Sequence, residues 1–217
     1  MKVTISTKEI HDFLMASLFG GYNPTKINDL IDNNPSKIDL AIKRAYRDMN
    51  RTLQTKKHQD EWNDLKKEGI DIIKNAIQDK EKVLCFINNK EGYDYWFYRV
   101  LGSLISLNKI VSEENNNKVK LEYTYGQAHK WINMTMKYLI VLNYELVLKV
   151  IPFLHVPIDE IVVDTAIAEC KTKYLKTQLI PWSKEIDETN YKKFQNEIRE
   201  KTECPIKWEF NIWNEGK

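Results

Sequence analysis

Cysteine, glycine and proline are all scarce in this chain, and each shortage excludes a class of fold. Three widely spaced cysteines among 217 residues argue against a disulfide framework or a zinc site, and they suit the reducing environment of the cytoplasm. Seven glycines and six prolines are too few for long linkers or for a turn-rich all-β fold. We therefore expect a cytoplasmic protein with a substantial packed core.

Long hydrophobic runs and a strong charge of one sign are also missing. No apolar run approaches the roughly 18 residues that a membrane helix needs, and the first residues lack the apolar centre of a signal peptide. Lys and Arg number 33 against 31 Asp and Glu, a formal net charge of +2. Nucleic acid is thus permitted as a partner but not implied, and any basic surface must be local. We expect no membrane association.

Helical periodicity dominates what is present. Apolar residues recur every three to four positions over most of the chain, and Thr124 with Gln127 forms a capping box. We expect helices at about 7–18, 27–31, 36–54, 59–79, 93–107, 125–140, 161–170 and 189–201, with a polar loop at 113–118. The predicted fold class is all-α: one compact helical domain, or two intimately packed helical subdomains at 1–110 and 111–217.

The helix expected at 125–140 is apolar over most of its surface and carries one polar stripe. Lys130, Asn133 and Lys137 fall at i, i+3 and i+7, which places them on one face. Because the rest of the circumference is apolar, the helix should be buried nearly all round. Its polar stripe must then meet water, a partner or a functional site.

A lysine on such a helix, combined with a later aspartate, has the composition of a nucleophilic site. Burial lowers the pKa of a lysine, and a neutral amine is a nucleophile. Asp159 follows Pro157, which stiffens the turn, and a carboxylate there is placed to orient the amine or to stabilise a developing positive charge. The structural alternative is that Lys130 is exposed to solvent and that Asp159 only caps the next helix.

The last 100 residues or so resemble the helix-hairpin-helix DNA glycosylases, and most of all the archaeal 8-oxoguanine DNA glycosylases. In that family a catalytic lysine opens a hydrophobic helix, a second lysine follows two turns later, and an aspartate lies in a Pro-Val-Asp turn. Lys130 matches the first lysine, Lys137 the second, and Pro157-Ile158-Asp159 the turn. The hairpin motif that precedes the lysine in the family is replaced here by Tyr125-Gly126-Gln127.

The resemblance implies a DNA-repair glycosylase with AP lyase activity that needs neither a metal nor an organic cofactor. Its partner would be double-stranded DNA with a damaged base, which must be flipped out of the duplex before it can react. Lys130 would attack the sugar C1′ and form a Schiff base as the purine leaves, and Asp159 would stabilise the positive charge. The residues expected around the base are Trp131, Asn133, Lys137 and Trp213, with Trp182 and Trp208 as further candidates for stacking.

The helix at 36–54 offers a surface for DNA. Lys43, Arg47 and Arg51 recur at i, i+4 and i+8, opposite the apolar face, and such a basic stripe can follow a phosphate backbone. The alternative is an ordinary solvated helix face, because several aspartates dilute the charge.

Two other functions remain open from the sequence. Arg51 and His58 have an Arg-x(4–6)-His spacing that resembles the ribonuclease motif of HEPN domains, in which the arginine steadies the phosphate and the histidine is the acid or base. A non-catalytic helical module would instead hold nucleic acid or protein. That hypothesis predicts that Lys130 and Asp159 lie far apart, whereas the glycosylase hypothesis predicts that they converge in a cleft beside aromatic rings.

Overall fold

The computed structural model describes residues 37–53, 57–78, 87–112, 117–169, 179, 181–184 and 186–214, together with Ser6, Lys8 and Ile10. Its helices are α3 (Lys37–Asn50), α4 (Gln59–Gln78), α5 (Lys90–Ile105), α6 (Tyr125–Val141), α7 (Glu145–Leu148), α8 (Glu160–Glu169), α9 (Glu188–Lys201) and α10 (Pro205–Asn214), with a 3₁₀ turn at Ile151–Phe153. The expected helices before residue 37 lie outside the described residues, except for Lys8 and Ile10, which are helical. The predicted helical class is confirmed.

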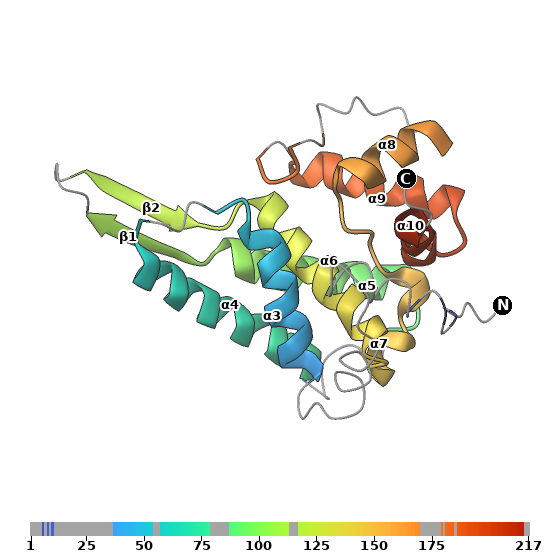
Figure 1. Cartoon of the computed structure of the whole chain (residues 1–217), viewed down its shortest axis with the longest axis horizontal. Coiled ribbons are helices and arrows are strands. Elements are labelled where there is room, and N and C mark those ends of the chain that lie inside the picture. Colours follow the sequence, from blue (N-terminus) through green and yellow to red (C-terminus); the bar gives the residue numbers. More distant parts are fainter. Residues whose placement is uncertain are drawn as a thin grey trace.

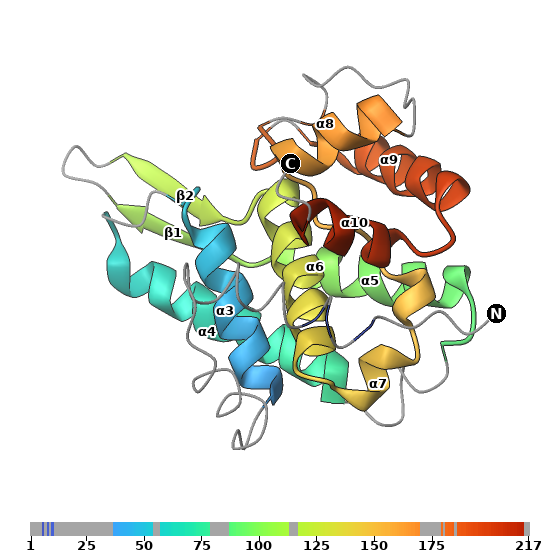
Figure 2. The same ribbon diagram turned by 45° about the vertical axis from the view of Figure 1, so that its right-hand side comes forward.

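Helix α6 runs through the middle of the molecule. Figure 1 shows α3 and α4 on one side of it and α8, α9 and α10 on the other, and Figure 2 shows the same division from a second direction. The helix packs against both α3 and α5, and every residue from 126 to 141 is buried. Its largely apolar sequence therefore found neighbours on all sides, as the pattern predicted.

The predicted capping box fixes where α6 begins. The backbone N–H of Gln127 donates to Thr124 Oγ1 at 3.1 Å, and the backbone N–H of Thr124 donates to Gln127 Oε1 at 3.0 Å. This exchange satisfies two donors at the start of the helix. The position of Lys130, on the next turn, follows from it.

A β-hairpin between α5 and α6 departs from the all-helical expectation. Strands β1 (Asn108–Ser112) and β2 (Lys118–Glu122) pair antiparallel, and Figure 1 shows them extending from the body beside α4. Val111 and Leu121 face inward while their neighbours are more exposed, which is the alternation of a half-buried strand. The expected subdomain boundary at residue 110 falls inside β1.

The aromatic tail forms one more helix that the sequence did not predict. Helix α10 begins at Pro205. Proline is tolerated in the first turn of a helix because the N–H that it lacks would have no partner within the helix.

Among the described helices, none is both long and apolar enough to cross a membrane.

Two helical glycines give a test of this packing. A Cβ at Gly69 in α4 would lie 2.4 Å from Cζ3 of the buried Trp131, whereas one at Gly102 in α5 would meet no atom within 4 Å. We expect Gly69→Ala to lower the free energy of unfolding by about 1–3 kcal/mol through overpacking. Gly102→Ala should raise it by about 0.5–1 kcal/mol, since alanine is the better helix former. Urea denaturation measures both, and equal stability of the two variants would contradict the packing of Trp131 against α4.

Candidate active site

Lys130 and Asp159 lie in direct contact. The Nζ of Lys130 donates to Asp159 Oδ2 at 3.0 Å and to the backbone carbonyl of Ile158 at 3.1 Å. The lysine side chain is 7% exposed and the aspartate side chain 20%, so the pair is shielded but reachable. The convergence expected of a nucleophile and its carboxylate is present, and Lys130 is not the solvated residue of the structural alternative.

Asp159 has a second contact that holds it in place. Its Oδ1 accepts from the backbone N–H of Val162 at 3.0 Å, which caps the start of α8. One carboxylate oxygen thus fixes the helix while the other meets the amine. The capping role expected from the sequence exists, but it is only half of what the residue does.

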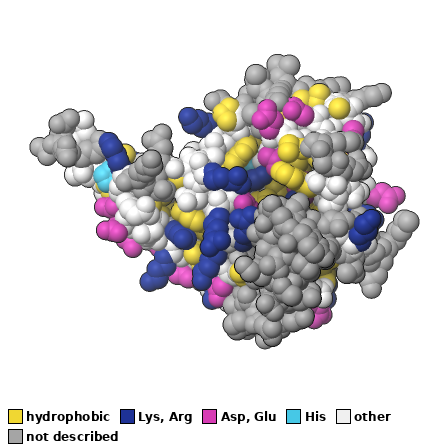
Figure 3. Space-filling model, viewed as in Figure 1, with side chains coloured by type: hydrophobic (Ala, Val, Ile, Leu, Met, Phe, Trp, Pro, Cys, Tyr) yellow, Lys and Arg dark blue, Asp and Glu magenta, His cyan; other side chains and the backbone are white. Residues whose placement is uncertain are grey.

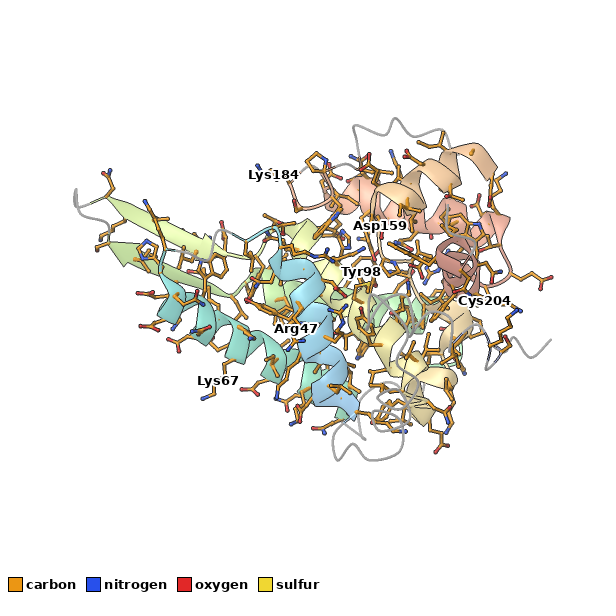
Figure 4. All side chains as sticks on the ribbon, in the orientation of Figure 1. Arg47, Lys67, Tyr98, Asp159, Lys184 and Cys204 are labelled. Atoms are coloured by element: carbon orange, nitrogen blue, oxygen red, sulfur yellow. The ribbon has the colours of Figure 1, made fainter. Side chains whose placement is uncertain are left out.

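A pocket of about 700 Å³ opens beside this pair, within the range of ligand sites. Its lining residues are Arg44, Asp48, Arg51, Thr52, Lys130, Met134, Lys137, Tyr138, Asp159, Glu160, Ile161, Trp182 and Trp213. The Nζ of Lys130 lies 5.7 Å from the ring centroid of Trp182. The amine, the carboxylate and two indole rings therefore border the same space, and Figure 4 shows Asp159 facing the region between α6 and α8.

The wall made by Trp182 depends on a glycine of α6. The backbone carbonyl of Trp182 approaches Gly126 so closely that a Cβ there would lie 1.7 Å from the oxygen. Thr124 Oγ1 also donates to the carbonyl of Ser183 at 2.7 Å. Both contacts fasten this short segment to the start of α6, one turn from Lys130.

The second lysine of the polar stripe is paired with a residue that the sequence did not single out. The Nζ of Lys137 lies 2.5 Å from Glu209 Oε1, and the two side chains are 1% and 0% exposed. Burial lowers the pKa of Lys137 and raises that of Glu209, and their mutual attraction opposes both shifts. Lys137 also lies 5.6 Å from the ring centroid of Trp213. In the sequence, the only sign of this buried partner was that Glu209 is a single acidic residue within an aromatic segment.

A chain of buried hydrogen bonds runs behind the pocket from α6 to α9 and α5. Asn133 Nδ2 donates to the hydroxyl of Tyr191, which lies 2.9 Å from His155 Nδ1. His155 Nε2 lies 2.9 Å from Asp94 Oδ1, and Arg199 Nη1 donates to Asp94 Oδ2 at 3.0 Å. A carboxylate only accepts, so the neutral imidazole carries its proton on Nε2 and Nδ1 accepts from Tyr191.

The same neighbours clamp the backbone that leads to Asp159. Gln195 accepts from the N–H of Val156 and donates to its carbonyl, both at 2.9 Å. Arg199 Nη2 donates to the carbonyl of Phe153 at 2.5 Å. An extended segment in the core lowers the stability of the fold unless its backbone N–H and C=O groups are hydrogen-bonded. Helix α9 therefore supplies hydrogen-bond partners that stabilise this extended segment, and the segment in turn fixes the position of Asp159.

The surroundings of His155 keep it neutral. Burial lowers its pKa to about 4, although the hydrogen bond to Asp94 acts in the opposite direction. Protonation would make Nδ1 a donor towards the Tyr191 hydroxyl, which already accepts from Asn133. Burial by itself raises the pKa of Asp94, but the hydrogen bonds from His155 and Arg199 outweigh it and bring that pKa to about 2.

Trp131 and Asn133, both expected around the base, do not line the pocket. Trp131 points to the other side of α6, where its Nε1 donates to the carbonyl of Ile42 at 3.1 Å. Asn133 is covered by the extended segment and donates to the carbonyl of Val156 at 3.3 Å. Trp131 thus packs against α3, and Asn133 against the connection at 151–159. Both side chains stabilise the fold and do not contact the pocket.

Some of the remaining predicted residues border the pocket and others do not. Lys137, Trp213 and Trp182 border the pocket, whereas Trp208 donates to Glu169 at 3.2 Å and does not. Lys43 and Arg47 are exposed on α3, and Arg51 is exposed directly after its end. Figure 3 shows Lys and Arg side chains gathered over that helix. Of the three, Arg51 alone borders the pocket, and His58, its partner in the ribonuclease hypothesis, does not.

Comparison of the chain with family models, with curated proteins and with solved structures gave no match. The function must therefore be argued from the site itself.

The neutral state of His155 predicts an acid-sensitive fold. In the unfolded chain its pKa is near 6.5, whereas in the fold it is about 4, so the unfolded state binds protons first as the pH falls. The free energy of unfolding should therefore decrease between pH 6.5 and pH 4, by roughly 3 kcal/mol from this residue. Burial also lowers the pKa of His129, which adds a loss of the same sign.

Urea denaturation across this pH range separates the two histidines. His155→Gln should be less stable than the wild type at pH 7 and should lose less stability on acidification. A variant with the wild-type pH dependence would show that His155 is not held neutral.

Proposed function

We propose that this protein is a DNA glycosylase with AP lyase activity, in which Lys130 is the nucleophile and Asp159 the stabilising carboxylate. The observation that carries the proposal is the 3.0 Å contact between Lys130 Nζ and Asp159 Oδ2 at the edge of a pocket bordered by Trp182 and Trp213. An amine is useful as a nucleophile only where a substrate can approach it, and this one borders open space.

Each residue has a defined task in the proposed reaction. The flipped nucleotide enters the pocket, with its base beside the indole rings, which offer stacking surfaces. One proton of Lys130 passes to the departing base, and the amine forms a bond to C1′ while the bond from C1′ to the base nitrogen breaks, so the base leaves with that electron pair as a neutral purine. Asp159 lies next to the carbon that gains positive charge. Opening of the sugar ring, with transfer of a second proton from the nitrogen to O4′, then gives the Schiff base.

The exposed stripe on α3 supports the choice of DNA as the partner. Lys43 and Arg47 are exposed on the helix that also brings Arg51 to the pocket. Phosphate contacts of this kind supply affinity without sequence preference, and they weaken steeply with salt. A non-catalytic binding module would use the same stripe, but it would not need the pair of Lys130 and Asp159 to border a pocket.

Borohydride trapping tests the nucleophile. Duplex oligonucleotides with 8-oxoguanine, with an abasic site or with no lesion are incubated with the protein and sodium borohydride. We expect a covalent adduct with the damaged duplexes, because borohydride reduces the Schiff base to a stable amine. Lys130→Ala should abolish it, whereas Lys149→Ala should not, since Lys149 is exposed at the end of α7 and forms an ion pair with Glu145 one turn away.

An adduct that persists in Lys130→Ala would assign the chemistry to another amine. No adduct on any duplex, with the helical circular dichroism intact, would end the glycosylase-lyase proposal.

Replacement of Asp159 separates capping from chemistry. Asparagine is as good an N-cap as aspartate, whereas alanine costs about 1 kcal/mol. We therefore expect Asp159→Asn to keep about 1 kcal/mol more stability than Asp159→Ala. Both should slow the trapping reaction roughly 100-fold, because both remove the charge beside C1′. A wild-type rate in Asp159→Asn would reduce Asp159 to a structural residue.

A further inference from the structure

Two guanidinium groups meet at one carboxylate on the α3 wall of the pocket. Arg44 Nη1 lies 3.2 Å and Arg51 Nη2 lies 3.5 Å from Asp48 Oδ1, and the aspartate side chain is only 9% exposed. Asp48 Oδ2 is occupied as well, since it accepts from the hydroxyl of Tyr138 at 2.6 Å. Two positive groups therefore meet at one negative group on this wall of the pocket.

Most of Arg51 remains available for a ligand. Its side chain is 79% exposed, and a guanidinium has five N–H donors in a planar fork. The single contact with Asp48 is long, at 3.5 Å, and it anchors one end of the group without using the rest. Such a fork suits the oxygens of a phosphate.

The place of this wall relative to Lys130 is fixed by one hydrogen bond between helices. Gln127 Nε2 donates to Thr52 Oγ1 at 3.2 Å, and Thr52 Oγ1 donates to the carbonyl of Met49 at 2.9 Å. Thr52 follows Arg51, and Gln127 lies three residues before Lys130 on the same helix. The end of α3 is thus joined to the start of α6 where both border the pocket.

Charge is distributed unequally around the pocket. Asp159 and Glu160 lie at the start of α8, whereas Arg44 lies on α3 and Arg51 directly after its end. An anionic group that enters with a sugar is repelled by the first side and attracted by the second. The amine of Lys130 borders the same space as both.

We propose that Arg51, with Arg44 beside it and Thr52 joining this segment to α6, forms a phosphate subsite for the deoxyribose on which Lys130 acts. This inference rests on the proposed function and deepens it. The sugar that reacts in DNA carries phosphate, so a site that brings C1′ to Lys130 must also accept a phosphate within the same pocket. Lys43 and Arg47 lie on the same helix but do not border the pocket, so they act only in general attraction to DNA.

Small aldehydes test the subsite without a lesion. The open-chain forms of 2-deoxyribose and 2-deoxyribose 5-phosphate react with a lysine amine: the nitrogen bonds to the aldehyde carbon, water leaves, and borohydride adds hydride to the C=N bond to give a stable secondary amine. Mass spectrometry of the digested protein then gives the extent of labelling at Lys130. We expect the phosphate to raise the labelling rate at least about tenfold in the wild type, the effect of one charge-assisted hydrogen bond.

Arg51→Gln and Arg47→Gln are the matched variants, since both arginines are exposed, Arg47 on α3 and Arg51 directly after its end, and neither change should affect folding. Arg51→Gln should bring the ratio of the two rates close to one, whereas Arg47→Gln should leave it near the wild-type value. With an abasic duplex in place of the sugars, Arg51→Gln should lower trapping more than Arg47→Gln does. An effect on the free sugar phosphate alone would overturn the role in DNA.

The other outcomes identify which proposal fails. If neither sugar nor abasic duplex labels Lys130, the proposed function is wrong and the subsite falls with it. If both sugars label it equally in the wild type, the lysine chemistry stands and the subsite is wrong. A ratio that survives in Arg51→Gln, or that falls equally in Arg47→Gln, also overturns the subsite.

Discussion

The burial of charged groups on α6 is the constraint around which the C-terminal part of the molecule is arranged. A helix that is covered on every side cannot send Lys130 and Lys137 to solvent, and an unpaired charge in the interior costs several kcal/mol. Each lysine has therefore received its own acceptor: the turn at Asp159 for the first, and Glu209 of α10 for the second. Helices α8 and α10 dock on α6 through these two pairs, and the pocket is the space that remains between them and α3.

The sequence predicted the elements that depend on local signals. The capping box at Thr124 and Gln127 and the burial of α6 were visible, because each rests on spacing within a few residues. The meeting of Lys130 with the Pro-x-Asp turn joins residues 29 positions apart, and it was expected only from the resemblance to the glycosylases. Trp131 and Glu209 were not predictable in the same way. Which neighbour covers a given side of a buried helix depends on packing between distant segments, and periodicity says nothing of that choice. The hairpin was missed because its strands are short and flank a polar stretch.

The site supports the proposals at different levels of detail. A shielded amine beside a carboxylate, with arginines nearby, is compatible with the proposed attack on an electrophilic sugar carbon that carries phosphate. The choice of DNA over a small sugar phosphate depends further on the exposed stripe of α3, since only a long polyanion would use Lys43 and Arg47 together. The aromatic rings of Trp182 and Trp213 add a preference for a flat partner. The geometry thus supports the choice of reacting side chains more closely than it supports the choice between DNA and a small sugar phosphate as the substrate.

The capping bond from Asp159 to α8 has an evolutionary consequence. A residue that the fold requires persists whether or not its second role is used, so an aspartate at this position in a related chain would be no record of activity. Lys130 differs, because a buried charge that takes part in no reaction costs desolvation free energy, and substitution by an apolar residue removes that cost. Under the proposed function, the identity of residue 130 would therefore separate active lineages from silent ones, whereas residue 159 would remain a capping residue in both.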